Sequence, residues 1–296
     1  MKAEKRSKPK TCVICMKWGN TFGPDYVNML FGAVQDHLQL EHDFLCITDN
    51  PHGLDQGILT YPLSFPQLER QDWTHGKWPK LLMFNRDIVA DYDTALFLDL
   101  DLLITGDLAP LLTLVQDQGG LFLMPKFRGF VWRMIPAVIW DRAPWLMNKV
   151  TRGNSSIVGF IPSEQFHLFD QFDGRTALPK YDNDQNYISA RAFNRKCYPK
   201  NWCVGIIHLV HYWPFGLIFR QYKHRPRRPK IVIFNGDPKP VELVNDKIGY
   251  WGSRRRRAYG GISWVAEYLK KYGYSHKTGK KVCRAAKPAR QRVSSW

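Results

Sequence analysis

Two kinds of hydrophobic pattern alternate along the first third of the chain. Thr11–Met16 and Phe44–Thr48 are short runs of apolar and β-branched residues, which is typical of buried strands. Between them, Pro24 suits the first turn of a helix. Apolar residues follow at helical spacing: Tyr26, Val27, Leu30, Phe31, Val34 and Leu38. A strand, a helix and a second strand in this order form a βαβ unit, which predicts a mainly parallel sheet.

Further strands and helices are predicted as far as residue 272, with one segment between them that lacks a clear pattern. We expect further strands at Ala95–Leu98, Gly120–Met124, Ser155–Phe160, Cys203–Ile207 and Ile231–Phe234. We expect helices near Lys77–Val89, Asp184–Phe193 and Ile262–Tyr272. Residues 125–152 have no clean period, and we interpret them as a long insertion that flanks the active site. The pattern predicts an α/β fold with a mixed, mainly parallel central sheet flanked by helices.

The positive charge lies mostly outside this patterned body. The chain of 296 residues has a formal net charge of +17, yet residues 1–10, 223–230 and 253–296 carry +4, +5 and +12. The remaining residues are therefore mildly acidic. We predict a basic N-terminal arm at 1–10, a catalytic domain at 11–252, and a basic extension at 253–296 with one short helix. Basic ends of this kind suit an anionic membrane surface or an anionic glycan, and an acidic body makes nucleic acid a poor partner.

The first residues of the sequence and the spacing of the cysteines argue against a secreted protein and against a zinc finger. MKAEKRSKPK has no apolar segment of the kind that secretion signals contain. We therefore expect a cytoplasmic protein, held at most peripherally at the inner face of the membrane. Cys12 and Cys15 form a C-x-x-C pair with no second pair at zinc-finger spacing, so we interpret them as small buried hydrophobes.

The stretch that carries the most chemical information follows the strand at 95–98. Asp99 and Asp101 lie two residues apart, so in an extended chain their carboxylates project to the same face. The four residues before them are apolar, which places the pair at the carboxyl end of a buried strand, where ligand sites of open α/β sheets lie. A divalent cation such as Mg²⁺ or Mn²⁺ would relieve the repulsion between two such carboxylates. The alternative is that both are solvated in a loop.

Several segments, taken in order, resemble the GT-A-fold glycosyltransferases of the glycogenin-like and bacterial lipopolysaccharide-galactosyltransferase-like retaining family. The resemblance spans about residues 11–245. It rests on VICMKWGNTFGPDYVNML, FLCITDN, GKWPKLLMF, ALFLDLDLLITGDLAPLL, NSSIVGF, DNDQNYI and IVIFNGDPKP. It implies a GT-A-like nucleotide-diphospho-sugar transferase fold. It also implies that Asp99 and Asp101 hold Mn²⁺ or Mg²⁺ against the two phosphates of a nucleotide sugar.

The resemblance assigns further residues to the donor. Trp18, Gly19 and Asn20, after the first strand, would contact the nucleoside. Asn154 and Ser155 would hydrogen-bond the sugar, although a simple turn before a strand explains them as well. Asp184 and Gln185 would lie near the anomeric carbon as catalytic groups. The alternative there is a helix N-terminus capped by Asp182 or Asn183.

Two lysines and a glycine complete the expected phosphate site. Lys80 precedes the strand at 95–98, and Lys239 lies in the turn Gly236-Asp237-Pro238-Lys239-Pro240. Both lysines could bring positive charge to the phosphates. Gly236 would allow the backbone to approach closely. Either lysine could instead be an ordinary solvated charge.

The chain departs from the family at the third metal ligand. The resemblance would place a histidine just before Gly236, but the sequence has Asn235 there. Asn235 could coordinate the metal weakly through its carbonyl oxygen. His208 or His211 could substitute from another strand, although either is more typically a core or surface residue.

We therefore expect a metal-dependent glycosyltransferase that moves a hexose from a nucleoside-diphosphate sugar, with UDP as the expected nucleotide, to a hydroxyl of a glycan, lipid or protein acceptor. The resemblance implies retention of configuration. Two alternatives stay open: a sugar-nucleotide pyrophosphorylase, and a non-catalytic basic adaptor for membranes or nucleic acid. The first would need a glycine-rich basic loop where this chain has Trp18 to Gly23.

Overall fold

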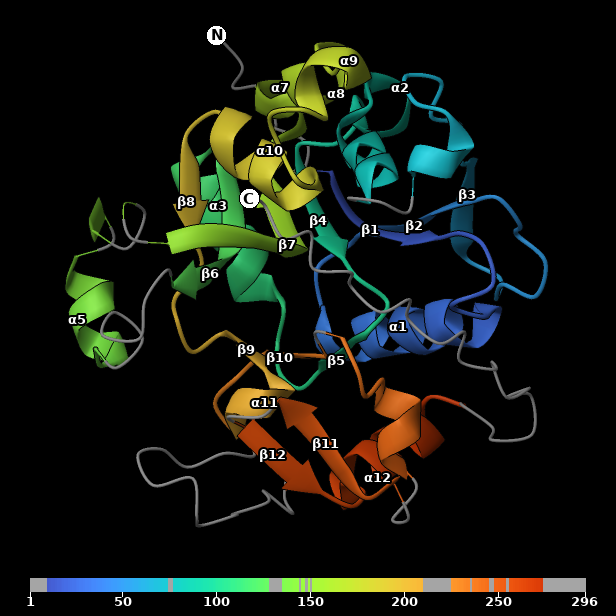
Figure 1. Ribbon diagram of the computed structural model, residues 1–296, viewed down its shortest axis with the longest axis vertical. Coiled ribbons are helices and arrows are strands. Elements are labelled where there is room, and N and C mark those ends of the chain that lie inside the picture. Colours follow the sequence, from blue (N-terminus) through green and yellow to red (C-terminus); the bar gives the residue numbers. More distant parts are fainter. Residues whose placement is uncertain are drawn as a thin grey trace, which may run out of the picture.

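The computed structural model describes residues 10–73, 77–127, 135–143, 145–146, 149, 151–209, 225–234, 236–244, 248–253 and 256–273. Figure 1 shows a central sheet with helices on both faces and a smaller lobe built by the last part of the described chain. The predicted α/β class is confirmed.

The central sheet has seven strands. In spatial order they are β3 (Ile58–Pro62), β2 (Asp43–Thr48), β1 (Thr11–Lys17), β4 (Thr94–Leu98), β7 (Thr151–Phe160), β6 (Leu121–Phe127) and β8 (Arg195–Cys197). Strand β1 pairs in parallel with β2 and β4, and β2–β3 and β6–β8 are parallel too. Strand β7 is antiparallel to both of its neighbours, so the sheet is mixed but mainly parallel, as the sequence predicts.

Two smaller sheets lie beyond the central one. Strands β5 (Leu102–Ile104), β10 (Ile231–Ile233) and β9 (Cys203–Gly205) form the first, with β10 in the middle. Strands β11 (Tyr250–Ser253) and β12 (Arg256–Tyr259) form an antiparallel hairpin. Strand β5 follows β4 after three residues, so the chain passes directly from the large sheet into the three-stranded one.

Helices cover both faces of the central sheet. The α-helices are α1 (Pro24–His37), α2 (Arg86–Val89), α3 (Ala109–Gln118), α5 (Ala137–Arg142), α7 (Pro162–Gln165), α8 (His167–Asp170), α9 (Gly174–Ala177), α10 (Asp184–Arg191), α11 (Ile206–Leu209) and α12 (Ser263–Lys271). The 3-10 helices are η1 (Arg70–Asp72), η2 (Trp78–Phe84) and η3 (Pro240–Val244). No helix in the described part of the chain is both long and apolar enough to cross a bilayer.

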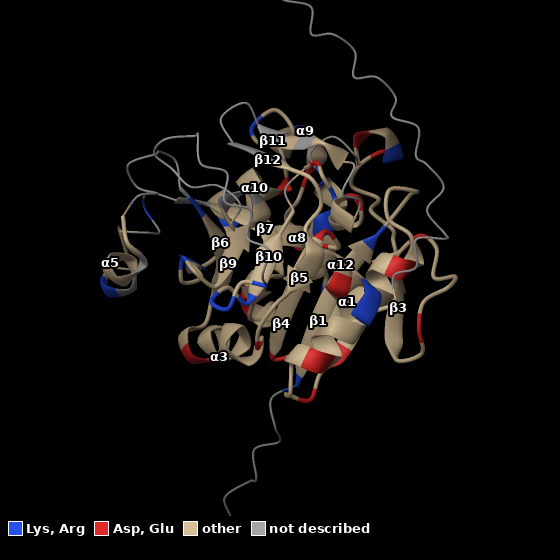
Figure 2. Cartoon of the chain, turned by 90° about the horizontal axis from the view of Figure 1, so that it is seen from below, with Lys and Arg blue, Asp and Glu red and all other residues tan. Residues whose placement is uncertain are grey.

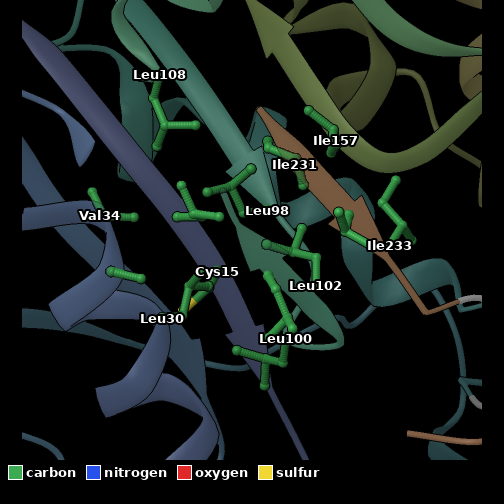
Figure 3. Close-up of a cluster of buried hydrophobic side chains, with 14 of the residues drawn as sticks. Cys15, Leu30, Val34, Leu98, Leu100, Leu102, Leu108, Ile157, Ile231 and Ile233 are labelled. Carbon is green, nitrogen blue, oxygen red and sulfur yellow. The ribbon is translucent and has the colours of Figure 1, made fainter. Parts of the chain in front are cut away.

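Alternate residues of the central strands pack into two separate hydrophobic cores, one on each face of the sheet. Val13 and Cys15 of β1 pack with α1, α3 and α12 on one face, whereas Ile14 packs with η2, α8 and α10 on the other. The first core continues beyond the end of β4: Figure 3 shows Leu98, Leu100 and Leu102 in one row beside Ile231 and Ile233 of β10. Because these leucines point into the first core, the side chains of the residues between them, Asp99 and Asp101, point to the opposite side. Cys12 and Cys15 are buried and form no disulfide, which agrees with their interpretation as core residues.

Three details of the expected secondary structure are wrong. The helix expected at Lys77–Val89 is two short pieces, η2 and α2, because Asn85 is extended and its side chain accepts a hydrogen bond from the amide of Asp87, which caps α2. The strand expected at Cys203–Ile207 ends at Gly205, because its partner β10 ends at the paired Ile233.

The third difference from the expected secondary structure is the hairpin of β11 and β12, because the sequence predicted only one short helix in the basic extension. The predicted domain division at residue 252 falls inside β11, and it stays a prediction. Helix α12 contributes Trp264, Val265 and Leu269 to the first core, so the part of the extension that the structure describes packs against the main body. Residues 1–9 and 274–296, which hold most of the basic ends, lie outside the described residues.

Gly159 in β7 offers a test of the packing between the central sheet and α3. A Cβ at this position would overlap the hydroxyl oxygen of Tyr198, which is fully buried, and would lie 2.8 Å from a methyl group of Val115. Gly159→Ala should therefore reduce the free energy of unfolding by about 1–3 kcal/mol in urea titrations, because an overpacked core cannot relax freely. Gly23→Ala is the control, since a Cβ there meets nothing within 4 Å. Equal stability of both variants would contradict this packing.

Candidate active site

The aspartate pair of Asp99-Leu100-Asp101, called the motif from here on, forms the link between two sheets. Asp99 follows the last residue of β4 and Asp101 precedes the first residue of β5. Leu100 between them is 3% exposed and points into the first core, so the two carboxylates project to the opposite side. The spacing prediction that both face the same way is therefore consistent with the packing.

Backbone pairing on each side of this link brings two distant segments to the carboxylates. The amide of Asp99 donates to the carbonyl of Ser156 at 2.9 Å, which continues the β4–β7 ladder by one residue. The amide of Phe234 donates to the carbonyl of Asp101 at 3.0 Å, which continues the β5–β10 ladder in the same way. Residues 154–156 and the turn after β10 therefore flank the motif from opposite sides.

Lys80 of η2 forms an ion pair with Asp99. Its Nζ lies 2.6 Å from Oδ1 and 2.8 Å from Oδ2 of Asp99, and the lysine side chain is 6% exposed. Burial alone would lower the pKa of Lys80, but the charges of Asp99, Asp184 and Asp101 outweigh this effect and raise it. Lys80 is therefore a fixed ammonium group inside the site and not the solvated charge that the sequence left open.

Lys239 neutralises the second aspartate from the other side. Its Nζ lies 2.5 Å from Oδ2 of Asp101, across 138 residues of sequence. Burial and the neighbouring charge of Asp99 raise the pKa of Asp101, while Lys239 acts in the opposite direction. The backbone amide of Lys239 is held by the carboxylate of Glu242, so the turn that carries the lysine is itself fixed. Gly236 in this turn has φ +86°, a left-handed conformation that favours glycine.

A third carboxylate lies at the first residue of α10. Asp184 is 3% exposed, and Ser155 of β7 donates a hydrogen bond of 2.7 Å to its Oδ2. Burial raises the pKa of Asp184, whereas the charge of Lys80 and the bond from Ser155 oppose the rise. Asn183 caps the helix through a bond from the amide of Asn186. The capping alternative is therefore correct for Asn183, and it leaves Asp184 free to face the site.

These groups line one cavity of about 440 Å³. The predicted residues on its wall are Lys80, Asp99, Asp101, Asn154, Ser155, Asp184, Gln185, Gly236 and Lys239. Four residues that we did not assign to the site also line it: Lys77, Ser156, Asp182 and Asn183. The volume is in the range of pockets that bind small molecules.

Lys77 gave no sequence signal that would separate it from other surface lysines. It has φ +57°, a left-handed conformation that is uncommon outside glycine, and it is the residue directly before η2. No ion pair to Lys77 is present among the residues that the structure describes. Asp182 and Asn183 could have been found, since they are the polar residues directly before the Asp184–Gln185 pair.

The residues expected around the nucleoside do not line the cavity. Trp18 packs partly against the second core, and the amide of Gly19 donates to Asp49 at 3.1 Å, while Asn20 is exposed. They follow β1, which is parallel to β4, so they lie at the same edge of the sheet as Asp99. The same loop reaches the site through Phe22, whose ring centroid lies 5.3 Å from Nζ of Lys239.

The expected third metal ligand cannot be placed. Asn235, His211 and the side chain of His208 lie outside the described residues. Within the described residues, no cluster of three or more His, Cys, Asp and Glu side chains is arranged to hold a metal ion. The oxygens that could hold one are the carboxylates of Asp99 and Asp101.

Solved glycosyltransferase structures share this fold. An active-site mutant of the galactosyltransferase LgtC aligns with a TM-score of 0.52 over 88% of this chain and 95% of its own, at 11% sequence identity. The bifunctional glycosyltransferase WbbM aligns with a TM-score of 0.56 over 93% of this chain and 51% of its own, at 13% identity. GlyE of Streptococcus pneumoniae aligns with a TM-score of 0.52 over 88% of this chain and 60% of its own, at 14% identity.

The sequence comparisons give no relative. No protein-family model matches the chain, and no curated protein matches it in sequence. At 11–14% identity the structural likeness establishes the fold, which is the GT-A-like fold that the sequence predicts. The chain spans nearly the whole of LgtC but only about half of WbbM.

The buried state of Asp184 predicts a pH-dependent stability difference. Its pKa is raised in the folded state, so the folded protein binds its proton at a higher pH than the unfolded chain does. The contribution of Asp184 to stability is therefore most favourable at low pH and is lost as the pH rises through the folded pKa. Asp184→Asn removes this contribution and retains an acceptor for Ser155. The free energy of unfolding of Asp184→Asn, measured relative to that of the wild type, should therefore increase with pH. The total increase should be about 1.4 kcal/mol for each unit by which folding raises the pKa of Asp184.

Urea unfolding at a series of pH values measures this difference. Asp182→Asn is the control for the change in formal charge, because this neighbouring side chain is exposed. A stability difference between Asp184→Asn and wild type that stays constant with pH would show that Asp184 is not held as the structure has it.

Proposed function

We propose that this chain is a glycosyltransferase that moves a hexose from a nucleoside-diphosphate sugar to an acceptor hydroxyl. The observation that carries the proposal is the arrangement of charges in the cavity: two aspartates at the end of β4, each held by its own lysine, with a third carboxylate and amide groups opposite. The shared fold with LgtC, WbbM and GlyE, whose printed names are those of glycosyltransferases, supports the same reaction class.

The charge of the cavity wall favours a donor that binds together with a cation. Three lysines and four aspartates line the cavity: Lys77, Lys80, Lys239, Asp99, Asp101, Asp182 and Asp184. Their formal charges sum to a net negative charge, so a diphosphate would enter a site that does not attract it. An added divalent cation reverses this balance.

Asp99 and Asp101 fit Mg²⁺ or Mn²⁺ in their chemistry. Both present carboxylate oxygens on one side of the chain, and oxygen ligands of this kind are the ones that Mg²⁺ and Mn²⁺ prefer in proteins. Diphosphate oxygens or water would complete such a ligand set, together with Asn235 if its amide oxygen faces the metal. When bound, the metal supplies Lewis-acid stabilisation of the departing nucleoside diphosphate.

The other residues of the site would bind the parts of the donor that the metal does not contact. Lys239 would contact the diphosphate from the turn after β10, where Gly236 lets the backbone approach, and Lys80 would hold Asp99 in position. Asn154 would face the sugar hydroxyls. Ser155 orients Asp184, and Asp184 and Gln185 would stabilise positive charge at the anomeric carbon. Trp18, Gly19 and Asn20 would contact the nucleoside at the rim of the site.

The finer points of the proposal rest on the sequence resemblance. UDP-sugars are the first donors to test, and we propose transfer with retention of configuration. The acceptor is a glycan, a lipid or a protein. We also propose that the protein acts in the cytoplasm at the inner face of a membrane, because its basic ends suit an anionic surface.

Asp99→Asn and Asp101→Asn should each lower metal-dependent transfer by about a hundredfold or more, because each removes a carboxylate whose interaction with the metal stabilises developing charge by several kcal/mol. Release of UDP from a panel of UDP-sugars, with and without Mn²⁺, measures the effect. Asp117→Asn, an exposed change on α3, is the control. Full activity in either motif variant would refute the metal assignment. Formation of nucleoside triphosphate from donor and pyrophosphate, without transfer, would favour the pyrophosphorylase alternative.

Lys77→Gln should weaken donor binding by about tenfold and make it less sensitive to salt, because Lys77 is a lysine of the cavity wall that is not held by a carboxylate in the described structure. Titration of UDP in the presence of Mn²⁺ at several salt concentrations measures this. Lys180→Gln, at an exposed position outside the cavity, should change neither value. If both variants bind UDP like the wild type, Lys77 does not contact the diphosphate.

A further inference from the structure

Helix α5 stands apart from the rest of the molecule. In both orientations it lies to one side, beyond β6, and no other labelled element packs on its outer surface (Figures 1 and 2). It belongs to the segment between β6 and β7 that the sequence marks as an insertion. The catalytic proposal does not use this segment.

One side of α5 is fixed to the body. The side chain of Trp140 is 1% exposed and packs with Cys197 of β8, and Ile135 and Leu146 pack partly against the same cluster. Nζ of Lys200 donates to the carbonyl of Ile135 at 2.6 Å, just before the helix begins. These contacts hold α5 in place, so its outer side is presented in a defined way.

The outer side is also apolar. Val138 and Ile139 of α5 are 55% and 48% exposed, and Trp145, just after the helix, is 63% exposed, so all three lie within eight residues of sequence. Only five other large hydrophobic side chains are exposed in the described part of the chain, and they are scattered over it. A helix that is apolar on more than one side is normally buried in a protein core or in a membrane. A concentrated exposed apolar group of this kind marks an interaction surface.

The charge of the surrounding segment indicates the nature of the partner. Six basic residues and one acidic residue lie between 126 and 152: Lys126, Arg128, Arg133, Arg142, Lys149, Arg152 and Asp141. Nζ of Lys149 lies 5.6 Å from the ring centroid of Trp145, and Arg142 at the end of α5 is exposed. Tryptophan and aliphatic side chains flanked by lysine and arginine are typical of segments that lie in the headgroup region of anionic membranes.

We propose that the exposed surface formed by Val138, Ile139 and Arg142 of α5, together with Trp145 and Lys149 of the segment after it, docks on an anionic lipid bilayer. The apolar side chains enter the boundary between headgroups and acyl chains, and the basic side chains pair with lipid phosphates. This site is separate from the basic ends of the chain, and it does not depend on the proposed chemistry.

Vesicle co-sedimentation of the full chain tests the proposal. With vesicles that contain phosphatidylglycerol, a variant carrying Val138→Ser, Ile139→Ser and Trp145→Ser should bind at least about tenfold more weakly than the wild type. Arg142→Gln with Lys149→Gln should weaken binding to these vesicles at low salt, with little effect at high salt. All these side chains are exposed, so thermal unfolding should be unchanged.

Two controls keep the result specific. The first control is a variant that carries Leu40→Ser, Leu59→Ser and Phe193→Ser together. It loses the same number of exposed hydrophobic side chains elsewhere on the protein and should bind vesicles like the wild type. Deletion of residues 278–296 reports the separate contribution of the basic tail. The proposal is overturned if the α5 variant and this control bind equally. It is also overturned if the wild type is a dimer in light scattering and the α5 variant is a monomer, because the surface then binds a second copy.

Discussion

The site depends on the cost of placing two carboxylates side by side at the end of a buried strand. Leu98, Leu100 and Leu102 are buried in the first core. Because successive side chains of an extended chain point to opposite sides, Asp99 and Asp101 both face the cavity. Burial and the charge of Asp99 raise the pKa of Asp101, so the pair needs positive charge beside it as compensation. Two lysines supply that compensation, and the segments that carry them, η2 and the turn after β10, define the walls of the cavity.

The topology explains why these segments can meet. The link between β4 and β5 belongs to two sheets at once, so each aspartate has a different strand as its neighbour. On one side the ladder with β7 brings Ser155 and, through it, Asp184 of α10. On the other side the ladder with β10 brings Lys239. The charged groups therefore come from both sheets, and their spacing is set by backbone pairing and not by loops alone.

The sequence predicted the parts of the site that follow from local pattern. The apolar strand before Asp99 and the two-residue spacing predicted the α/β class and the position of the two carboxylates, whereas the GT-A-like fold and most other residues of the cavity wall were implied by the family resemblance of the ordered segments. Lys77 could not be predicted, because its left-handed backbone and its position depend on tertiary packing. The break at Asn85 was missed because the apolar residues on both sides keep a helical spacing. The hairpin of β11 and β12 was missed because its arginine-rich strand has no alternating pattern.

The long sequence separation between Asp101 and Lys239 has a consequence for biosynthesis. While the chain leaves the ribosome, β1, α1 and β4 can associate early, since the contacts among them are comparatively local. The carboxylate of Asp101 then stays without its ammonium partner until β10 and the turn after it have been made. A nascent chain or a truncated product that ends before residue 239 thus lacks one wall of the cavity. The order of synthesis makes completion of the site one of the last events of folding.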